Sequence, residues 1–266
     1  MTLSLAWTRA SGNTQQLVCA TDSRLRFGGH WDCGPKLFPT CRGDSAIMFA
    51  GDTIYAYPII HHILDAISQH PKSAKRALDL PELKGHLLRV LNATLAEVAD
   101  LPKAVATPEV EFIFAGYVWR RQKFTGWHLH YDKEILRFTF RPMGRWSGSR
   151  TNKRLILAGD YKDEFKLRLV ALLKQRGKLT IGDFDMEPFE VLRDMLRSGD
   201  FPYIGGPPQM AKIYQHLNST SVAVCWPSLA DGRVSIGGRA LLDYEKTEMP
   251  TLDPDLLTIE RRGGAA

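Results

Sequence analysis

The sequence predicts an α+β fold in which helices face stacked antiparallel sheets within one domain. Strand-like and helix-like segments occur in blocks (strands, two helices, strands, two helices, strands) rather than in strict alternation, and such blocks are typical of antiparallel sheets. The chain has 266 residues, of which 44% are apolar, enough for a substantial core. No internal repeat or low-complexity linker divides it. We therefore expect a single domain over residues 1–245, followed by a polar tail over 246–266.

The first block contains four strand-like runs. Apolar and β-branched residues predict strands at 2–8, at 16–22, around Lys36 and Phe38, and at 45–50. Asp22 closes the second strand and Gly51 stops the fourth.

Two helices are expected next, over residues 52–69 and 81–98. Asp52 or Thr53 suits the N-cap of the first helix, and apolar residues follow at near-helical spacing. Pro81 fits the first turn of the second helix, where leucines recur every four residues from Leu83 to Leu95.

The rest of the chain repeats this order. Strands are expected at 109–115, 124–131, 135–140 and 155–158, with a loop at 141–152. Helices at 161–175 and 186–197 precede a glycine- and proline-rich loop at 201–208. The last strands are expected at 210–217, 220–226 and 232–238.

Charge, cysteine content and hydropathy argue against several classes of protein. No apolar run reaches the roughly 18 residues of a membrane span, and no secretory signal pattern is present, so we expect a cytoplasmic protein without a membrane partner. The four cysteines lack Cys-x-x-Cys spacing, which disfavours a disulfide framework or structural zinc. The net charge is +6, but the basic residues are scattered, and the densest group lies in the 141–154 region. A solvated loop is therefore favoured over a nucleic-acid site.

Thr2 is the most informative residue. Aminopeptidases usually remove an initiator Met that precedes a residue as small as threonine, which would leave Thr2 with both a hydroxyl and a free α-amine. A threonine whose own amine accepts the hydroxyl proton is a known nucleophile. An unperturbed terminal amine has a pKa of about 7.7–8.0, which suits a base at neutral pH.

The next fifty residues offer the other groups that such a site needs. A cation would keep the amine neutral and assist ionisation of the hydroxyl, and Lys36 is the candidate. Asp22, at a strand end, would hold that cation. The N–H of Gly51 would receive the oxyanion that develops on the attacked carbonyl.

In these segments the chain resembles the N-terminal third of proteasome β subunits and of the bacterial HslV peptidase, which are N-terminal nucleophile (Ntn) hydrolases. Their pattern is an N-terminal threonine, an aspartate in an Ala-Asp-Ser-Arg stretch, a lysine, and an Ala-Gly turn before the first helix. Here Thr2, Asp22, Lys36 and Gly51 occur in that order, with Ala20-Thr21-Asp22-Ser23-Arg24 and Phe49-Ala50-Gly51-Asp52 around two of them. The resemblance implies a four-layer αββα sandwich.

The chain also departs from the family pattern. The family has a serine in a Gly-Ser-Gly turn, where this sequence has Asp160, a carboxylate that could bind the Thr2 ammonium but also weaken it as a base. Asp200 is the only reasonable counterpart of a second family aspartate. Phe49 and Thr53, placed around Gly51, are the candidate substrate-binding residues.

The resemblance implies a threonine peptidase that needs no metal or organic cofactor. It further implies protein or peptide substrates, a homo-oligomeric ring or stack, and an ATP-dependent unfoldase as partner. Two alternatives stay open: an amidohydrolase of small molecules with the same chemistry, and a non-catalytic scaffold subunit. His128 and His130 share one strand face, a spacing that can bind metal, but no third ligand is evident and a partly exposed strand face is the favoured interpretation.

Overall fold

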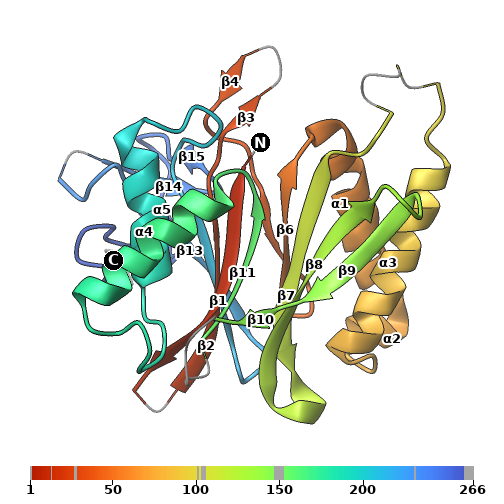
Figure 1. Cartoon of the computed structure of the whole chain (residues 1–266), viewed down its shortest axis with the longest axis horizontal. Coiled ribbons are helices and arrows are strands. Elements are labelled where there is room, and N and C mark those ends of the chain that lie inside the picture. Colours follow the sequence, from red (N-terminus) through yellow and green to blue (C-terminus); the bar gives the residue numbers. More distant parts are fainter. Residues whose placement is uncertain are drawn as a thin grey trace.

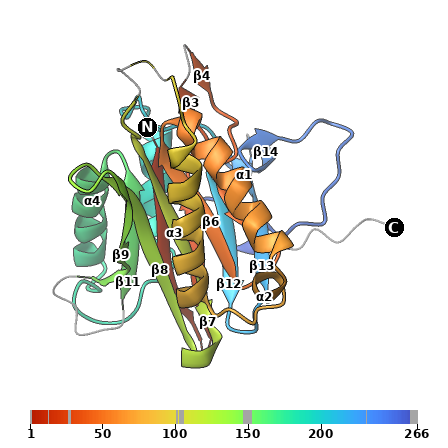
Figure 2. The ribbon, with the colours of Figure 1, turned by 90° about the vertical axis from the view of Figure 1, so that its right-hand side faces the viewer.

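Two large sheets with helices packed on them make up the structure, a computed structural model shown in Figures 1 and 2. The structure describes residues 2–12, 14–26, 29–100, 102, 106–146, 153–230 and 232–260. The two sheets lie next to each other in Figure 1, and the N-terminal strand runs through the middle of one of them.

The larger sheet has ten strands, and its central order is β10-β11-β1-β2-β12-β13-β14-β15. All pairings along this order are antiparallel, while β16 joins β13 in parallel and pairs with β17. The strands are β1 (Leu3–Ser11), β2 (Thr14–Thr21), β10 (Gly144–Arg145), β11 (Arg154–Gly159), β12 (Gln209–Tyr214), β13 (Ser219–Trp226), β14 (Arg233–Ile236), β15 (Arg239–Ala240), β16 (Thr251–Leu252) and β17 (Ile259–Glu260).

The second sheet has five antiparallel strands in the order β5-β6-β7-β8-β9. They are β5 (Leu37–Pro39), β6 (Ser45–Gly51), β7 (Val110–Val118), β8 (Lys123–Asp132) and β9 (Arg137–Pro142). A separate two-stranded ribbon, β3 (Leu25–Arg26) with β4 (His30–Trp31), extends above both sheets in Figure 1.

Helices α1 (Thr53–Gln69) and α3 (Leu80–Ala96) pack on the five-stranded sheet, with the short α2 (Pro71–Ala74) between them in the chain (Figure 2). Asp52 caps α1 by accepting a hydrogen bond from Ile54 N. Asp79 and Glu82 form a capping box at the start of α3. Helices α4 (Lys162–Gln175) and α5 (Glu187–Ser198) pack on the ten-stranded sheet.

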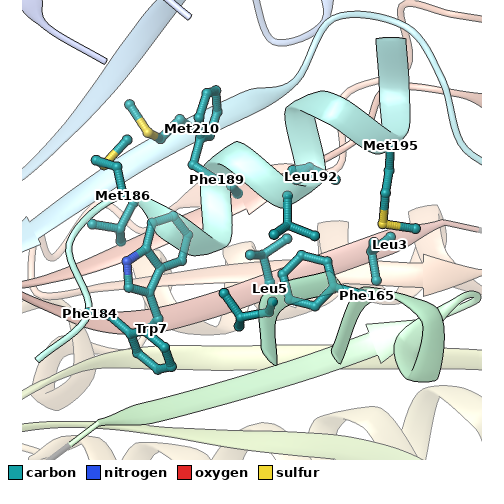
Figure 3. Close-up of a cluster of buried hydrophobic side chains, with 14 of the residues drawn as sticks. Leu3, Leu5, Trp7, Phe165, Phe184, Met186, Phe189, Leu192, Met195 and Met210 are labelled. Atoms are coloured by element: carbon teal, nitrogen blue, oxygen red, sulfur yellow. The ribbon is translucent and has the colours of Figure 1, made fainter. Parts of the chain in front are cut away.

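The start of β1 is fixed by the core beneath α4 and α5. Figure 3 shows Leu3, Leu5 and Trp7 pointing from β1 into a cluster with Phe165 of α4 and side chains of α5. Between the two sheets lies a further cluster that includes Ala6, Met48 and Ala158. Because β1 is buried on both faces, the residue that precedes it has a defined position.

The prediction of an α+β four-layer αββα sandwich is wrong. Within the described part of the chain, seventeen strands form three sheets while only five α-helices occur, and 27% of the structure is helical, so antiparallel sheet predominates. The sequence reading missed β10 in the expected loop at 141–152, and β16 and β17 in the expected tail after 245. Each of these strands has two residues, too few to produce a recognisable alternation of apolar and polar positions.

Candidate active site around Thr2

Thr2 lies at the start of β1, between the ends of β2 and β11. The register places Leu3 opposite Gly159 and Ser4 opposite Thr21, so Thr2 is next to Asp160 on one side. Two hydrogen bonds fix its backbone: Thr2 N donates to Asp160 Oδ2 (3.0 Å), and Asp160 N donates to Thr2 O (2.7 Å). Only 1% of Thr2 is exposed, so this end of the chain is held in the protein.

The Lys36 ammonium contacts the Thr2 hydroxyl. Lys36 Nζ lies 2.7 Å from Thr2 Oγ1, and it donates to both carboxylate oxygens of Asp22 (3.0 and 3.1 Å) and to Arg24 O. The Lys36 side chain is fully buried. Burial lowers the pKa of Lys36, while the charge and hydrogen bonds of Asp22 oppose that shift.

Asp22 is a buried carboxylate that binds several donors besides Lys36. Leu3 N donates to Asp22 Oδ1 (3.1 Å), and Arg24 N and Gly205 N donate to Oδ2 (2.9 and 3.2 Å). These N–H groups and Lys36 give both oxygens of this fully buried side chain hydrogen-bond donors. Asp22 therefore links β1, the turn after β2 and the loop before β12.

Gln209, a residue that the sequence reading missed, holds the backbone around Lys36. Its Oε1 accepts hydrogen bonds from Lys36 N (3.0 Å) and Leu37 N (3.2 Å). Its Nε2 donates to Ser23 Oγ (2.9 Å) and Gly34 O (2.7 Å). Gln209 lies more than 170 positions from Lys36 in the chain, so no local pattern could have indicated it.

A second missed residue, Glu111, holds the turn that contacts Thr2. Gly159 N donates to Glu111 Oε2 (2.8 Å), and His128 Nε2 and Lys162 Nζ lie 3.1 and 3.2 Å from the same oxygen. Burial would raise the pKa of Glu111, but these donors and charges outweigh it and lower the pKa to about 2. Gly159 itself has φ of +96°, and a Cβ there would lie 2.0 Å from Thr2 O.

Gly51 borders two cavities at the end of β6. One, of about 460 Å³, is also lined by Glu109, Gly159 and Asp160. The other, of about 210 Å³, is also lined by Asp52 and Thr53. Gly51 has φ of +106° and pairs with Val110. Gly159 and Asp160, which line the first cavity, also contact Thr2: Asp160 through the two hydrogen bonds above, and Gly159 as the residue opposite Leu3.

The three other residues predicted for the site, Thr53, Phe49 and Asp200, lie in different surroundings. Thr53 lines the smaller cavity beside Gly51. The Phe49 ring is fully buried in the core beneath α1 and α3, edge-on to Tyr57, so it does not border a cavity at Thr2. Asp200 is exposed, and within the described residues its side chain has no hydrogen bond or ion pair with Thr2, Asp22 or Lys36. The contact from that loop comes from Gly205.

His128 and His130 stack with ring centroids 5.2 Å apart, and His128 contacts Glu111. No group of three or more His, Cys, Asp or Glu residues with the geometry of a metal site occurs in the described ranges. None of the helices in these ranges is both long enough and apolar enough to span a membrane.

Comparisons with protein-family models and with curated proteins find no match for this chain.

Proposed function

We propose that the chain is an amide hydrolase that uses Thr2 as an N-terminal nucleophile after Met1 is removed, with peptides as the first substrate class to test. The observation that carries the proposal is the 2.7 Å contact between Lys36 Nζ and Thr2 Oγ1. It is a buried contact between a hydroxyl at the start of the chain and an ammonium group that Asp22 holds in place. A buried lysine with a lowered pKa and a specific charge partner is typical of functional sites.

The chemistry follows from the groups at this position. Thr2 Oγ1 attacks the substrate carbonyl carbon, and its proton passes to the Thr2 amine that removal of Met1 would create. The carbonyl π electrons move to oxygen, and the Gly51 N–H is the proposed donor to the resulting oxyanion. When the tetrahedral intermediate collapses, the C–N bond breaks and the amine returns the proton to the leaving nitrogen. Water then hydrolyses the ester on Thr2 by the same sequence.

Lys36 has the electrostatic role in this scheme. Its positive charge, 2.7 Å from Oγ1, favours the alkoxide over the hydroxyl and a neutral amine over an ammonium group. Asp160 has the opposite effect on the amine, because its Oδ2 lies 3.0 Å from Thr2 N and a carboxylate favours the ammonium form. In return, this carboxylate orients the nitrogen that must receive the proton.

The direct test combines mass and activity. Intact-mass measurement shows whether Met1 is absent, and a panel of fluorogenic peptides and small amides measures hydrolysis. We expect Thr2→Ala to remove hydrolysis and Thr2→Ser to retain part of it. Thr94→Ala, on α3, is the control and should leave activity unchanged.

Retention of Met1, or full activity of Thr2→Ala, would refute the proposal. A folded chain with Met1 removed and no hydrolysis of any amide would favour the scaffold-subunit alternative. Assembly into a ring and pairing with an unfoldase stay predictions from the family resemblance, to be checked by light scattering.

A further inference from the structure

A larger cavity of about 730 Å³ adjoins the 460 Å³ cavity that Gly51, Gly159 and Asp160 line. It lies along β10, β11 and α4, and we call it the β11–α4 groove. The two cavities share three lining residues, His128, Arg141 and Lys162. An elongated ligand that passes over these side chains could therefore occupy both cavities.

The walls of the β11–α4 groove are mainly aliphatic. Leu155 and Leu157 of β11 form one side, Val170 of α4 and Leu179 form another, and Trp146 adds an indole ring. Each of these five side chains is only partly buried. They therefore present apolar surface that a hydrocarbon chain would remove from water, a change worth about 25 cal/mol per Å².

The polar lining of the same groove is cationic. It includes Arg141, Arg145, Lys162 and Lys166, and none of its described lining residues is an aspartate or glutamate. Lys162 pairs with Glu111, and Lys166 pairs with Asp163.

The two arginines differ from the two lysines. Arg141 and Arg145 are exposed, and their guanidinium groups have no hydrogen bond or ion pair with any residue that the structure describes. Planar guanidinium groups bind carboxylates through two parallel hydrogen bonds. The groove thus combines an aliphatic wall with two carboxylate-binding groups that no described partner occupies.

We propose that the β11–α4 groove binds an aliphatic chain that bears a carboxylate, with the chain against Leu155, Leu157 and Val170 and the carboxylate at Arg141 and Arg145. Assigning this ligand as one half of an amide substrate rests on the proposed function of Thr2. The binding itself does not, because no groove residue takes part in the chemistry at Thr2. The ligand class favours the small-molecule alternative for the hydrolase.

The test measures binding of dodecanoate to the full-length Thr2→Ala chain by titration calorimetry, below the concentration at which the ligand forms micelles. Dodecyltrimethylammonium, with the same chain and the opposite charge, and acetate, with the charge but no chain, are the comparison ligands. We expect saturable one-to-one binding of dodecanoate and at least about tenfold weaker binding of both others. Equal binding of the cationic and anionic amphiphiles, or no binding of dodecanoate, would overturn the proposal.

Two sets of variants locate the site. Arg141→Gln/Arg145→Gln should weaken dodecanoate binding by about tenfold or more, whereas the matched control Arg89→Gln/Arg233→Gln, at exposed positions outside the groove, should not. Val170→Glu should weaken binding by charge repulsion more than Val170→Gln does. Circular dichroism checks that each variant is folded. Wild-type affinity in the Arg141/Arg145 variant would place the ligand elsewhere and reject the assignment.

The two proposals fail separately. Binding of dodecanoate that these variants weaken, together with a Thr2 that hydrolyses no amide, would reject the proposed function and leave the groove assignment standing. Hydrolysis of peptides without dodecanoate binding would reject the groove assignment and leave the proposed function standing.

Discussion

Lys36 Nζ lies 2.7 Å from Thr2 Oγ1, although 34 positions separate the two residues in the chain. The contact forms because β1 and the loop before β5 are each held by a long-range partner. Asp160 binds the backbone of Thr2, and Gln209 binds the backbone of Lys36.

Removal of the Lys36 charge should destabilise the protein and abolish hydrolysis. Lys36→Met leaves the buried Asp22 side chain without its cation, and breaking a buried pair in this way costs about 3–5 kcal/mol. Three backbone N–H groups still donate to Asp22 in this variant, so we expect a loss of about 3 kcal/mol, at the lower end of that range. Urea unfolding measures the loss.

The double variant Lys36→Met/Asp22→Asn separates charge from chemistry. It should recover much of the lost stability, because no uncompensated charge remains, but it should not recover activity. A double variant as unstable as Lys36→Met alone would contradict the role given to this ion pair.

The acid stability of the protein should depend on Glu111. Its folded pKa is lowered from 4.5 to about 2, so the folded state binds this proton less tightly than the unfolded state does. The stabilisation is therefore fully present above about pH 4.5 and is lost as the pH falls toward 2. The Glu111 side chain is 31% exposed, so solvent screens its interactions. We therefore expect ionised Glu111 to contribute about 1 kcal/mol to the free energy of unfolding.

The measurement compares wild type with Glu111→Gln by urea unfolding at several pH values. The difference in unfolding free energy should be constant between about pH 5 and 7 and should shrink as the pH falls below 4.5. A difference that stays constant throughout the acid range would argue against an ionised Glu111 at Gly159.

Gln209→Leu should reduce kcat more than it changes KM. The substitution leaves two backbone N–H groups near Lys36 without their acceptor, at a cost of about 3 kcal/mol. It also frees Lys36 to move away from Thr2.

Gln16→Leu is the matched control on β2, since Gln16 Oε1 is buried and has no hydrogen-bond partner among the described residues. The control should change stability by less than about 1 kcal/mol, and equal effects of the two variants would contradict a positioning role for Gln209.

Gly159→Ala should displace the start of β1. The methyl group would lie 2.0 Å from Thr2 O at a backbone φ of +96°, so the expected loss of stability is about 3 kcal/mol or more, with loss of activity. Gly177→Ala is the comparison, because Gly177 also has positive φ (+64°) but no atom within 4 Å of the added carbon. There we expect about 1 kcal/mol and wild-type activity. Thermal melts measure the stability of the two variants, and peptide hydrolysis measures their activity. Full activity of Gly159→Ala would show that hydrolysis does not require Thr2 to stay at the position where Asp160 binds it.

The local sequence indicated much of the secondary structure and part of the site. The apolar spacing in residues 81–98 predicted α3 to within two residues at each end, because a long amphipathic helix carries a strong period. Asp22 and Lys36 were predicted beside Thr2 from their order along strands, and the structure brings these side chains together. Phe49 was predicted to bind substrate, whereas the structure places its ring in the core beneath α1 and α3, because alternation along β6 turns it toward the helices.

The sequence by itself determined which chemical groups stand near the start of the chain: a threonine hydroxyl, a carboxylate at a strand end, a lysine and a glycine turn. Tertiary structure alone decided which distant groups hold them. Gln209 lies at the start of β12, which pairs with β2 in the large sheet, and from there its side chain binds the backbone of Lys36. Glu111 lies on β7 of the five-stranded sheet and binds Gly159 N of the large sheet. Local periodicity reports whether a residue faces the core, whereas sheet order and register set which remote residue it meets.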